Sequence, residues 1–223
     1  VTGGGAYCSG GTGVLVGLAA SAIGVNYQLY RGSTPVGTPV AGVGAALSFG
    51  LQTVAGIYTV VGTFASSSCS SNMSGSATVT ILPLPNVYTV TGGGSYCSGG
   101  SGVAVGLSGS DIGVSYKLYR SFPVASTSGT GAALSFGLMT IAGTYTVIGT
   151  STSGCTSTMS ASVTVSVNPL PTISGSIYTV MPSASITLTG TPSGGSWGSS
   201  NTAIATVNSS GVVSGVSLGT VVI

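Results

Sequence analysis

Residues 90–107 read V-T-G-G-G-S-Y-C-S-G-G-S-G-V-A-V-G-L, and residues 1–18 read V-T-G-G-G-A-Y-C-S-G-G-T-G-V-L-V-G-L. Both stretches join a glycine-rich, cysteine-bearing turn to an alternating apolar run. The correspondence continues along the chain, with spacings of 86 to 89 residues, in the pairs Tyr27 and Tyr116, Phe49 and Phe136, Tyr58 and Tyr145, and Cys69 and Cys155. A motif that recurs at such a spacing indicates tandem domains within the 223 residues.

Each copy contains short runs in which apolar and polar residues alternate, separated by Gly, Ser and Pro. Such alternation lets a strand pack one face in a core and wet the other. In the first copy the positions predicted to face the core are Val14, Val16, Leu18, Val25, Tyr27, Leu29, Leu47, Phe49, Leu51, Tyr58, Val60, Ala77, Val79 and Ile81. The second copy repeats the pattern, with Leu134, Phe136 and Leu138 in the places of Leu47, Phe49 and Leu51. About seven strands per copy, without helical patterns, predict an all-β fold of tandem immunoglobulin-like β-sandwiches.

Tyr58 and Tyr145 occupy equivalent A-G-x-Y-T-V segments, with a glycine two residues before each tyrosine. In immunoglobulin-like sandwiches a tyrosine at such a strand entry donates its hydroxyl to the backbone, which is called a tyrosine corner. The glycine favours this role over that of an ordinary strand tyrosine, so we predict structural tyrosine corners at both positions.

Proline-rich segments follow the last apolar run of each copy. Proline cannot continue a sheet ladder and keeps a connection extended. The predicted organisation is therefore an extended array of a first repeat (1–82), a linker (83–85), a second repeat (86–168), a linker (169–171) and a third domain (172–223). We expect the first strand of the array and the last strand of the third domain to be incomplete, as in an excerpt of a longer secreted polypeptide.

Residues 197–220 follow the pattern W-x-S-S-N-x-x-I-A-T-V-x-x-x-G-V-V-x-G-x-x-x-G-T. This pattern resembles the group 2 bacterial immunoglobulin-like domain of intimin- and invasin-like adhesins, and the resemblance covers nearly all of residues 172–223. It implies that Trp197 is a core or near-core residue. The G-G-G-x-Y-C-S-G-G and A-G-x-Y-T-V motifs of the two earlier copies resemble immunoglobulin-like or PKD-like repeats of very large bacterial surface proteins, including those exported by the type IX system of gliding bacteria.

The four cysteines fall in equivalent pairs, one pair in each repeat. Four cysteines allow three connectivities, and the duplication favours bonds within each repeat, Cys8 with Cys69 and Cys97 with Cys155. Each bond would staple a loop at one pole of a small domain, stabilise it by about 4 kcal/mol, and require an oxidising compartment. Zinc is disfavoured because the chain has no C-x-x-C spacing.

Only 2% of the residues are charged, the net charge is +2 and histidine is absent. This distribution provides no basic patch for nucleic acid, and no apolar run is long enough to span a membrane. Asp111 is the single carboxylate residue, so acid–base pairs, catalytic triads and calcium sites lack their side chains; it is predicted to serve a turn by bonding its own backbone. The glycine-rich turns precede strands and lack a lysine, which disfavours phosphate binding. We expect no enzyme activity, cofactor or metal.

Tyr30-Arg31 and Tyr119-Arg120 are the candidate contact surface. Alternation with Tyr27 and Leu29 places Tyr30 off the core face, and an outward tyrosine beside arginine suits contact with a glycan or a protein. Coverage of these tyrosines by the surrounding sheet or domain is the alternative.

Together these features predict an extracellular, cell-surface structural segment: a stalk or fibre of a large secreted bacterial protein that extends an adhesive region or forms a filament. Its near-neutral surface would let repeats of the same protein associate. Direct binding of surface glycans or proteins, and an accessory role in a secreted hydrolase, remain the alternatives.

Overall fold

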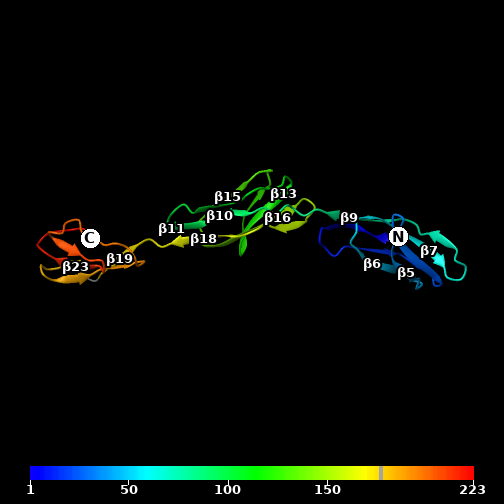
Figure 1. Ribbon diagram of the computed structural model, residues 1–223, viewed down its shortest axis with the longest axis horizontal. Coiled ribbons are helices and arrows are strands. Elements are labelled where there is room, and N and C mark those ends of the chain that lie inside the picture. Colours follow the sequence, from blue (N-terminus) through cyan, green and yellow to red (C-terminus); the bar gives the residue numbers. More distant parts are fainter. Residues whose placement is uncertain (176–177) are drawn as a thin grey trace. The chain divides into compact units, whose positions relative to one another are not determined.

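The computed structural model describes residues 1–175 and 178–223. Ser176 and Ile177, in the predicted third domain, lie outside the described residues. Strands, turns and bridges account for the regular structure, and no helix occurs in residues 1–175 or 178–223 (Figure 1). The prediction of an all-β fold is confirmed.

The chain forms two compact units, one of residues 1–91, 106–136 and 145–162, and one of residues 92–105, 137–144 and 163–223. Strands of the second repeat contribute to both units. The predicted division at the two proline linkers follows different boundaries and stays a prediction.

The first repeat is a pair of antiparallel-rich sheets, ordered β1-β3-β6 and β2-β9-β7-β4-β5, with β8 paired to β7. The strands are β1 (Thr2–Gly3), β2 (Gly5–Cys8), β3 (Val14–Leu18), β4 (Val25–Arg31), β5 (Thr34–Ala41), β6 (Leu47–Gln52), β7 (Gly56–Phe64), β8 (Ser70–Asn72) and β9 (Ala77–Leu82).

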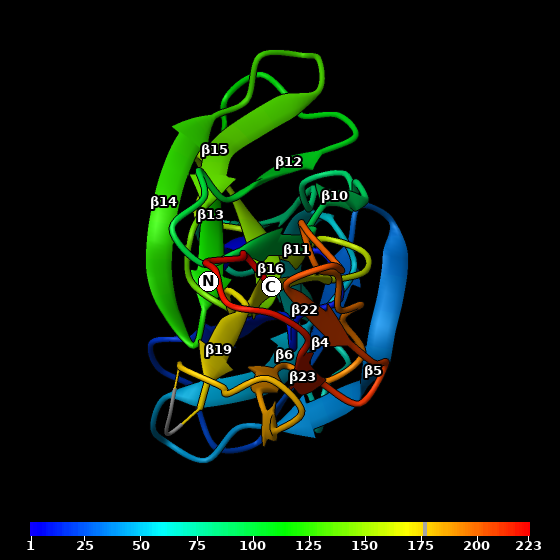
Figure 2. The same ribbon diagram turned by 90° about the vertical axis from the view of Figure 1, so that its left-hand side faces the viewer.

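The second repeat has the corresponding strands in the same order along the chain. They are β10 (Val90–Gly92), β11 (Gly94–Cys97), β12 (Val103–Leu107), β13 (Val114–Arg120), β14 (Phe122–Ser128), β15 (Leu134–Met139), β16 (Gly143–Ser151), β17 (Thr156–Thr158) and β18 (Val163–Asn168). Within the first unit β13 pairs antiparallel with β14, which lies beside it in Figure 2, and β16 pairs antiparallel with β17. Within the second unit β11 pairs parallel with β18, as β2 does with β9.

Residues 172–223 form two small sheets. They contain β19 (Thr172–Ser174), β20 (Ser185–Thr187), β21 (Thr189–Thr191), β22 (Ala205–Val207) and β23 (Val212–Gly215), in the orders β19-β21 and β20-β23-β22. Leu188, Ala205 and Val213 form the buried core, and Trp197 packs against it as the group 2 resemblance implies.

The Gly3-Gly4-Gly5 segment lets the first strand change sheets. Its glycines have φ values of +87°, +81° and +130°, a region that side-chain-bearing residues rarely adopt. A Cβ at Gly3 would lie 2.1 Å from the carbonyl oxygen of Leu15. The chain thereby leaves β3 after Gly3 and joins β9 from Gly5 onward. The glycine triplet of the repeated motif is therefore the point where the chain crosses from one sheet of the first repeat to the other.

Most predicted core positions of the first repeat are buried, among them Val16, Tyr27, Leu29, Val60 and Val79. They form one cluster that Phe49, Val14 and Met73 cover. Alternation thus identified the central strands correctly.

Two predictions of core positions are wrong, one in β6 and one in the equivalent strand β15. Leu51 is 56% exposed while Gln52 is buried, because Gly50 with φ +78° interrupts the alternation. The Gln52 amide, now inside, donates to the carbonyl of Phe49 over 2.9 Å. The second repeat repeats the shift, with Leu138 exposed and Met139 buried after Gly137 at φ +89°. Ile81 is also wrong: it is 39% exposed, near the end of β9.

Tyr58 is 1% exposed, and its hydroxyl donates to the carbonyl of Val54 over 2.7 Å. This bond to the backbone four residues upstream has the geometry of a tyrosine corner. Tyr145 is equally buried.

Replacing Tyr58 by Phe should destabilise the first repeat by about 1 kcal/mol, because the Val54 carbonyl loses its donor at a part-buried hydrogen bond. Urea titration followed by hydrogen-exchange mass spectrometry resolves peptides of β7 and measures the change. Tyr30→Phe, on the opposite face of the β4 alternation, is the matched control and should shift stability by less than about 0.5 kcal/mol. Equal effects of the two substitutions would contradict the corner role.

Candidate functional site

One disulfide joins the first repeat to the second: Cys8 at the end of β2 is bonded to Cys155, with 5.6 Å between their Cα atoms. Cys69 and Cys97 are free and exposed. The predicted connectivity, Cys8 with Cys69 and Cys97 with Cys155, is therefore wrong. The four cysteines remain the redox-active residues of the chain, but the bond links repeats instead of closing one.

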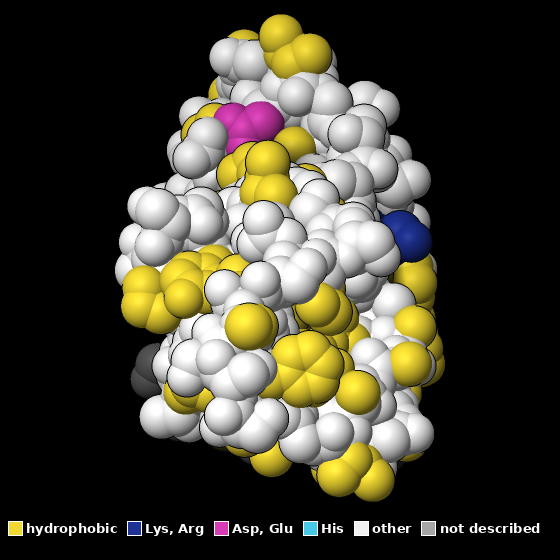
Figure 3. Space-filling model, turned by 90° about the vertical axis from the view of Figure 1, so that its right-hand side faces the viewer, with side chains coloured by type: hydrophobic (Ala, Val, Ile, Leu, Met, Phe, Trp, Pro, Cys, Tyr) yellow, Lys and Arg dark blue, Asp and Glu magenta, His cyan; other side chains and the backbone are white. Residues whose placement is uncertain are grey.

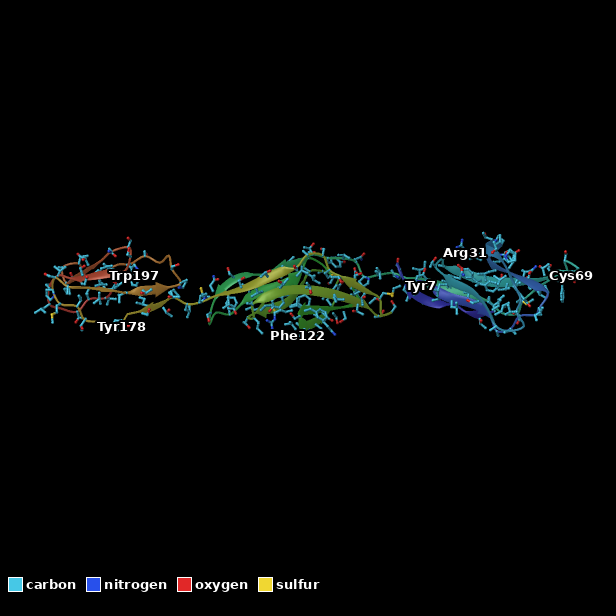
Figure 4. The ribbon with its side chains drawn as sticks, turned by 90° about the horizontal axis from the view of Figure 1, so that it is seen from below. Tyr7, Arg31, Cys69, Phe122, Tyr178 and Trp197 are labelled. Atoms are coloured by element: carbon cyan, nitrogen blue, oxygen red, sulfur yellow. A yellow bond between two sulfur atoms is a disulfide. The ribbon has the colours of Figure 1, made fainter. Side chains whose placement is uncertain are left out.

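Strand direction explains why Cys8 cannot reach Cys69. Cys8 pairs with Leu82, three residues beyond the Val79 that pairs with Gly56 at the start of β7. Cys69 lies at the other end of β7, where its carbonyl accepts a hydrogen bond from the Phe64 amide. The span is about eleven residues of strand, or about 35 Å, against the 4.4–6.8 Å between Cα atoms that a disulfide needs. In Figure 4, Tyr7 and Cys69 lie at opposite ends of the first repeat.

Residues 83–88, called the linker from here on, contact the segment that carries Cys155. Pro85 is buried, and its carbonyl accepts a hydrogen bond of 2.8 Å from the Ser157 hydroxyl, which lies in β17 two residues after Cys155. The Tyr88 amide lies 3.4 Å from the Met159 sulfur and donates to it. The linker is thus held along the same segment, Cys155–Met159, that carries the disulfide.

Asp111 also holds the linker, through its side chain. Its carboxylate accepts hydrogen bonds from the Asn86 amide (2.8 Å), the Asn86 side chain (2.9 Å) and the Tyr88 hydroxyl (2.8 Å). The Tyr88 ring lies against Gly109, where a Cβ would be 2.5 Å from the ring. The predicted bond from the Asp111 side chain to its own turn is wrong, because the carboxylate serves the linker instead.

The electrostatics of this contact follow from its hydrogen bonds. Donation from the Asn86 side chain, together with that from Tyr88, lowers the pKa of Asp111 below its ordinary value despite partial desolvation. The hydrogen bond to the carboxylate raises the pKa of Tyr88 in turn. The contact therefore favours the ionised carboxylate and the protonated phenol at neutral pH.

Apart from the cysteines, no motif of the sequence indicates this junction. Asp111 corresponds to Ala22 of the first repeat and Gly109 to Ala20, so the second repeat differs where it receives the linker. Comparison of the two copies at these positions is the signal that could have found the site.

Tyr30, Arg31, Tyr119 and Arg120 are half-buried at the ends of β4 and β13. The aliphatic stem of Arg31 covers Gly56, where an added Cβ would lie 2.9 Å from its Cγ. The candidate contact surface stays a prediction.

Charged groups are sparse and separate on the face drawn in Figure 3, which is mostly uncharged. In the part of the chain that the structure describes, no three His, Cys, Asp or Glu side chains gather as a metal site would require. A hollow of about 460 Å³ in residues 171–223 is lined by Ile173, Leu188, Trp197 and uncharged neighbours. Residues 1–175 and 178–223 contain no helix that is long and apolar enough to cross a membrane.

Residues 85–169 match a family described as an "Ig-like domain CHU_C associated". The match agrees with immunoglobulin-like repeats and is consistent with a structural or adhesion-type extracellular module. No curated protein matches the chain.

Solved structures with some likeness include murine CEACAM1b, with 14% identity, a TM-score of 0.36 and coverage of 73% of this chain and 96% of that one. Sidekick-1 immunoglobulin domains 1–4 have 15% identity, a TM-score of 0.35 and coverage of 96% and 66%. Drosophila OTK extracellular domains 3–5 have 12% identity, a TM-score of 0.33 and coverage of 95% and 84%.

Removing the Asp111 carboxylate should loosen the linker. The folded-state pKa of Asp111 is depressed, so its contribution to stability is present above the unfolded value of about 3.9 and is lost as pH falls through the lower folded value. Asp111→Ala should lower the thermal midpoint by a few degrees at pH 7 and by less below about pH 3.

Thermal melts of both proteins from pH 7 to pH 2 measure this difference. Asp111 is the sole acidic side chain, and the terminal carboxylate is common to both proteins, so the difference in the acid limb is assigned to Asp111. Ala22→Ser, at the equivalent position of the first repeat, is the control and should leave the pH profile unchanged. A constant difference between wild type and Asp111→Ala over the whole range would refute the carboxylate contact.

Proposed function

We propose that this chain is a non-enzymatic, load-bearing segment of a secreted bacterial cell-surface protein, acting as a stalk or fibre. The observation that carries the proposal is the Cys8–Cys155 bond between successive repeats, beside a linker whose Pro85 is buried and hydrogen-bonded to Ser157. A bond within a domain stabilises that domain alone, whereas a bond between domains resists their separation.

The position of the disulfide has a mechanical consequence. Tension applied at the two ends of the chain passes through the disulfide from Cys8 to Cys155. The backbone between these cysteines, which are 147 residues apart in sequence, does not transmit it. Nearly all of the first repeat and most of the second therefore carry no tension along their backbone while the bond is intact. Unfolding of these strands would not lengthen the chain.

The remaining features support this role. A disulfide requires an oxidising compartment, which for a bacterial protein means export from the cytoplasm. The nearly uncharged surface makes interactions little dependent on salt. The Ig-like match is of a kind common in extracellular structural and adhesive modules, and the polar groups of the junction are engaged in holding the linker.

Single-molecule force spectroscopy tests the proposal. Pulled between Val1 and Ile223, the oxidised chain should extend about 500 Å less than the reduced chain, because 147 residues at about 3.6 Å each are locked. Cys8→Ser should give the long extension without reductant. Cys69→Ser is the matched control and should retain the short extension.

Equal extension with and without reductant would overturn the load-bearing role. Two shorter locked segments, as expected for bonds inside each repeat, would contradict the inter-repeat bond but leave a stabilising role for the cysteines.

A further inference from the structure

In the contact between the two repeats, called the closed junction below, Cys8 is bonded to Cys155 and Ser157 donates to Pro85. Each of these four residues has an exposed equivalent elsewhere in the chain. Cys155, Ser157 and Pro85 are buried in the junction. Their repeat equivalents, Cys69, Ser71 and Pro171, are exposed. Cys8 is half-buried in its bond, and its equivalent Cys97 is exposed with a free thiol. The chain therefore carries one complete junction and the two separate halves of another.

The half at Cys69 includes a preformed hollow. It has a volume of about 300 Å³ and is lined by Val25, Tyr27, Phe64, Cys69 and Met73 among others. Phe64 is 53% exposed there. In the second repeat the residue equivalent to Met73 is Met159, which is 3% exposed and accepts the Tyr88 amide of the linker. The same surface is thus covered in one repeat and open in the other.

The half at Cys97 carries a linker with the same chemistry. Cys97 pairs with Asn168 at the end of β18, as Cys8 pairs with Leu82 at the end of β9. Each strand is followed by Pro-Leu-Pro, ending at Pro171 or Pro85. Pro171 is exposed, and its carbonyl would accept a hydrogen bond from a seryl hydroxyl, as that of Pro85 does from Ser157.

We propose that the Cys69 end of one copy receives the Cys97 end of a second copy, head to tail, and that the two thiols form an intermolecular disulfide. Ser71 of the first copy would donate to Pro171 of the second, as Ser157 donates to Pro85. This inference rests on the structural role proposed above and names its partner.

The two repeats differ at the surface that receives the linker, and the two linkers differ in the corresponding way. The receiving surface of the first repeat has Ala20 and Ala22 where the second has Gly109 and Asp111. The first repeat therefore lacks the space that the Tyr88 ring occupies beside Gly109. It also lacks the carboxylate that accepts hydrogen bonds from Asn86 and Tyr88. The segment after Pro171 carries Thr172 and Ser174 at the corresponding places, and these smaller side chains require neither. A second copy thus presents residues suited to this surface.

The bond is balanced by thiol–disulfide exchange. The Cys69 and Cys97 thiols each lose a proton, and together they lose two electrons to a low-molecular-weight disulfide such as oxidised glutathione, which leaves as two thiols. Because each copy has one end of each kind, the contact is heterologous and propagates into an open chain or closes into a ring.

The experiment uses the purified 223-residue protein in a glutathione redox buffer, followed by non-reducing electrophoresis and mass spectrometry of linked peptides. Wild type should form a ladder of covalent multimers through Cys69–Cys97. Cys69→Ser alone and Cys97→Ser alone should each stay monomeric. A mixture of the two variants should give a dimer and nothing larger, because only one complementary pair is then present.

A matched control separates docking from random oxidation. Cys69→Ser/Cys97→Ser/Ser126→Cys carries a single free thiol, moved to an exposed site on β14. Mixed with Cys69→Ser, whose one free thiol is Cys97, it should couple on the order of tenfold more slowly than Cys97→Ser does, since docking raises the effective concentration of the complementary thiols. Ser71→Ala should slow Cys69–Cys97 coupling without blocking it.

Three results would overturn the proposal: dimers of either single variant through like cysteines, coupling of the relocated thiol at the wild-type rate, or thiols that stay free under oxidation. None of these would affect the extension measured on a single chain, so failure of the assembly and failure of the load-bearing role are distinguishable.

Discussion

The structure depends on the packing of one linker between two repeats. Pro85 is buried and accepts a hydrogen bond from Ser157, while the Asp111 carboxylate accepts hydrogen bonds from Asn86 and Tyr88. These contacts bring the end of β9, and with it Cys8 on the parallel strand β2, to the segment that contains Cys155. Local hydrogen bonding along a few linker residues therefore determines which cysteines can bond.

The composition explains why a disulfide is useful for connecting these repeats. With 2% charged residues, the chain has few ion pairs with which to order one domain against the next. Its polar groups are mostly short hydroxyls and backbone amides, each worth about 1 kcal/mol in a hydrogen bond. A disulfide supplies a connection that salt and moderate changes of pH do not weaken, and the single carboxylate adds a directional contact at the same place.

The sequence was sufficient to predict the all-β fold, because alternation at residues such as Val16, Tyr27 and Val60 is a local property. It failed at Leu51 and Leu138, where a glycine with positive φ reverses the strand faces in a way that apolar spacing cannot reveal. It also failed at the cysteines. Duplication showed which cysteines are equivalent, but their pairing depends on strand direction, which places Cys8 and Cys69 at opposite ends of one sheet.

Peptide mapping of the oxidised monomer tests the inter-repeat bond most directly. Free thiols are alkylated first, and the protein is then digested with pepsin in acid, where thiolate exchange is suppressed. The structure predicts a linked peptide pair containing Cys8 and Cys155, with Cys69 and Cys97 alkylated. Linked pairs of Cys8 with Cys69 and of Cys97 with Cys155 would contradict it, and each repeat would then be an independently stapled domain.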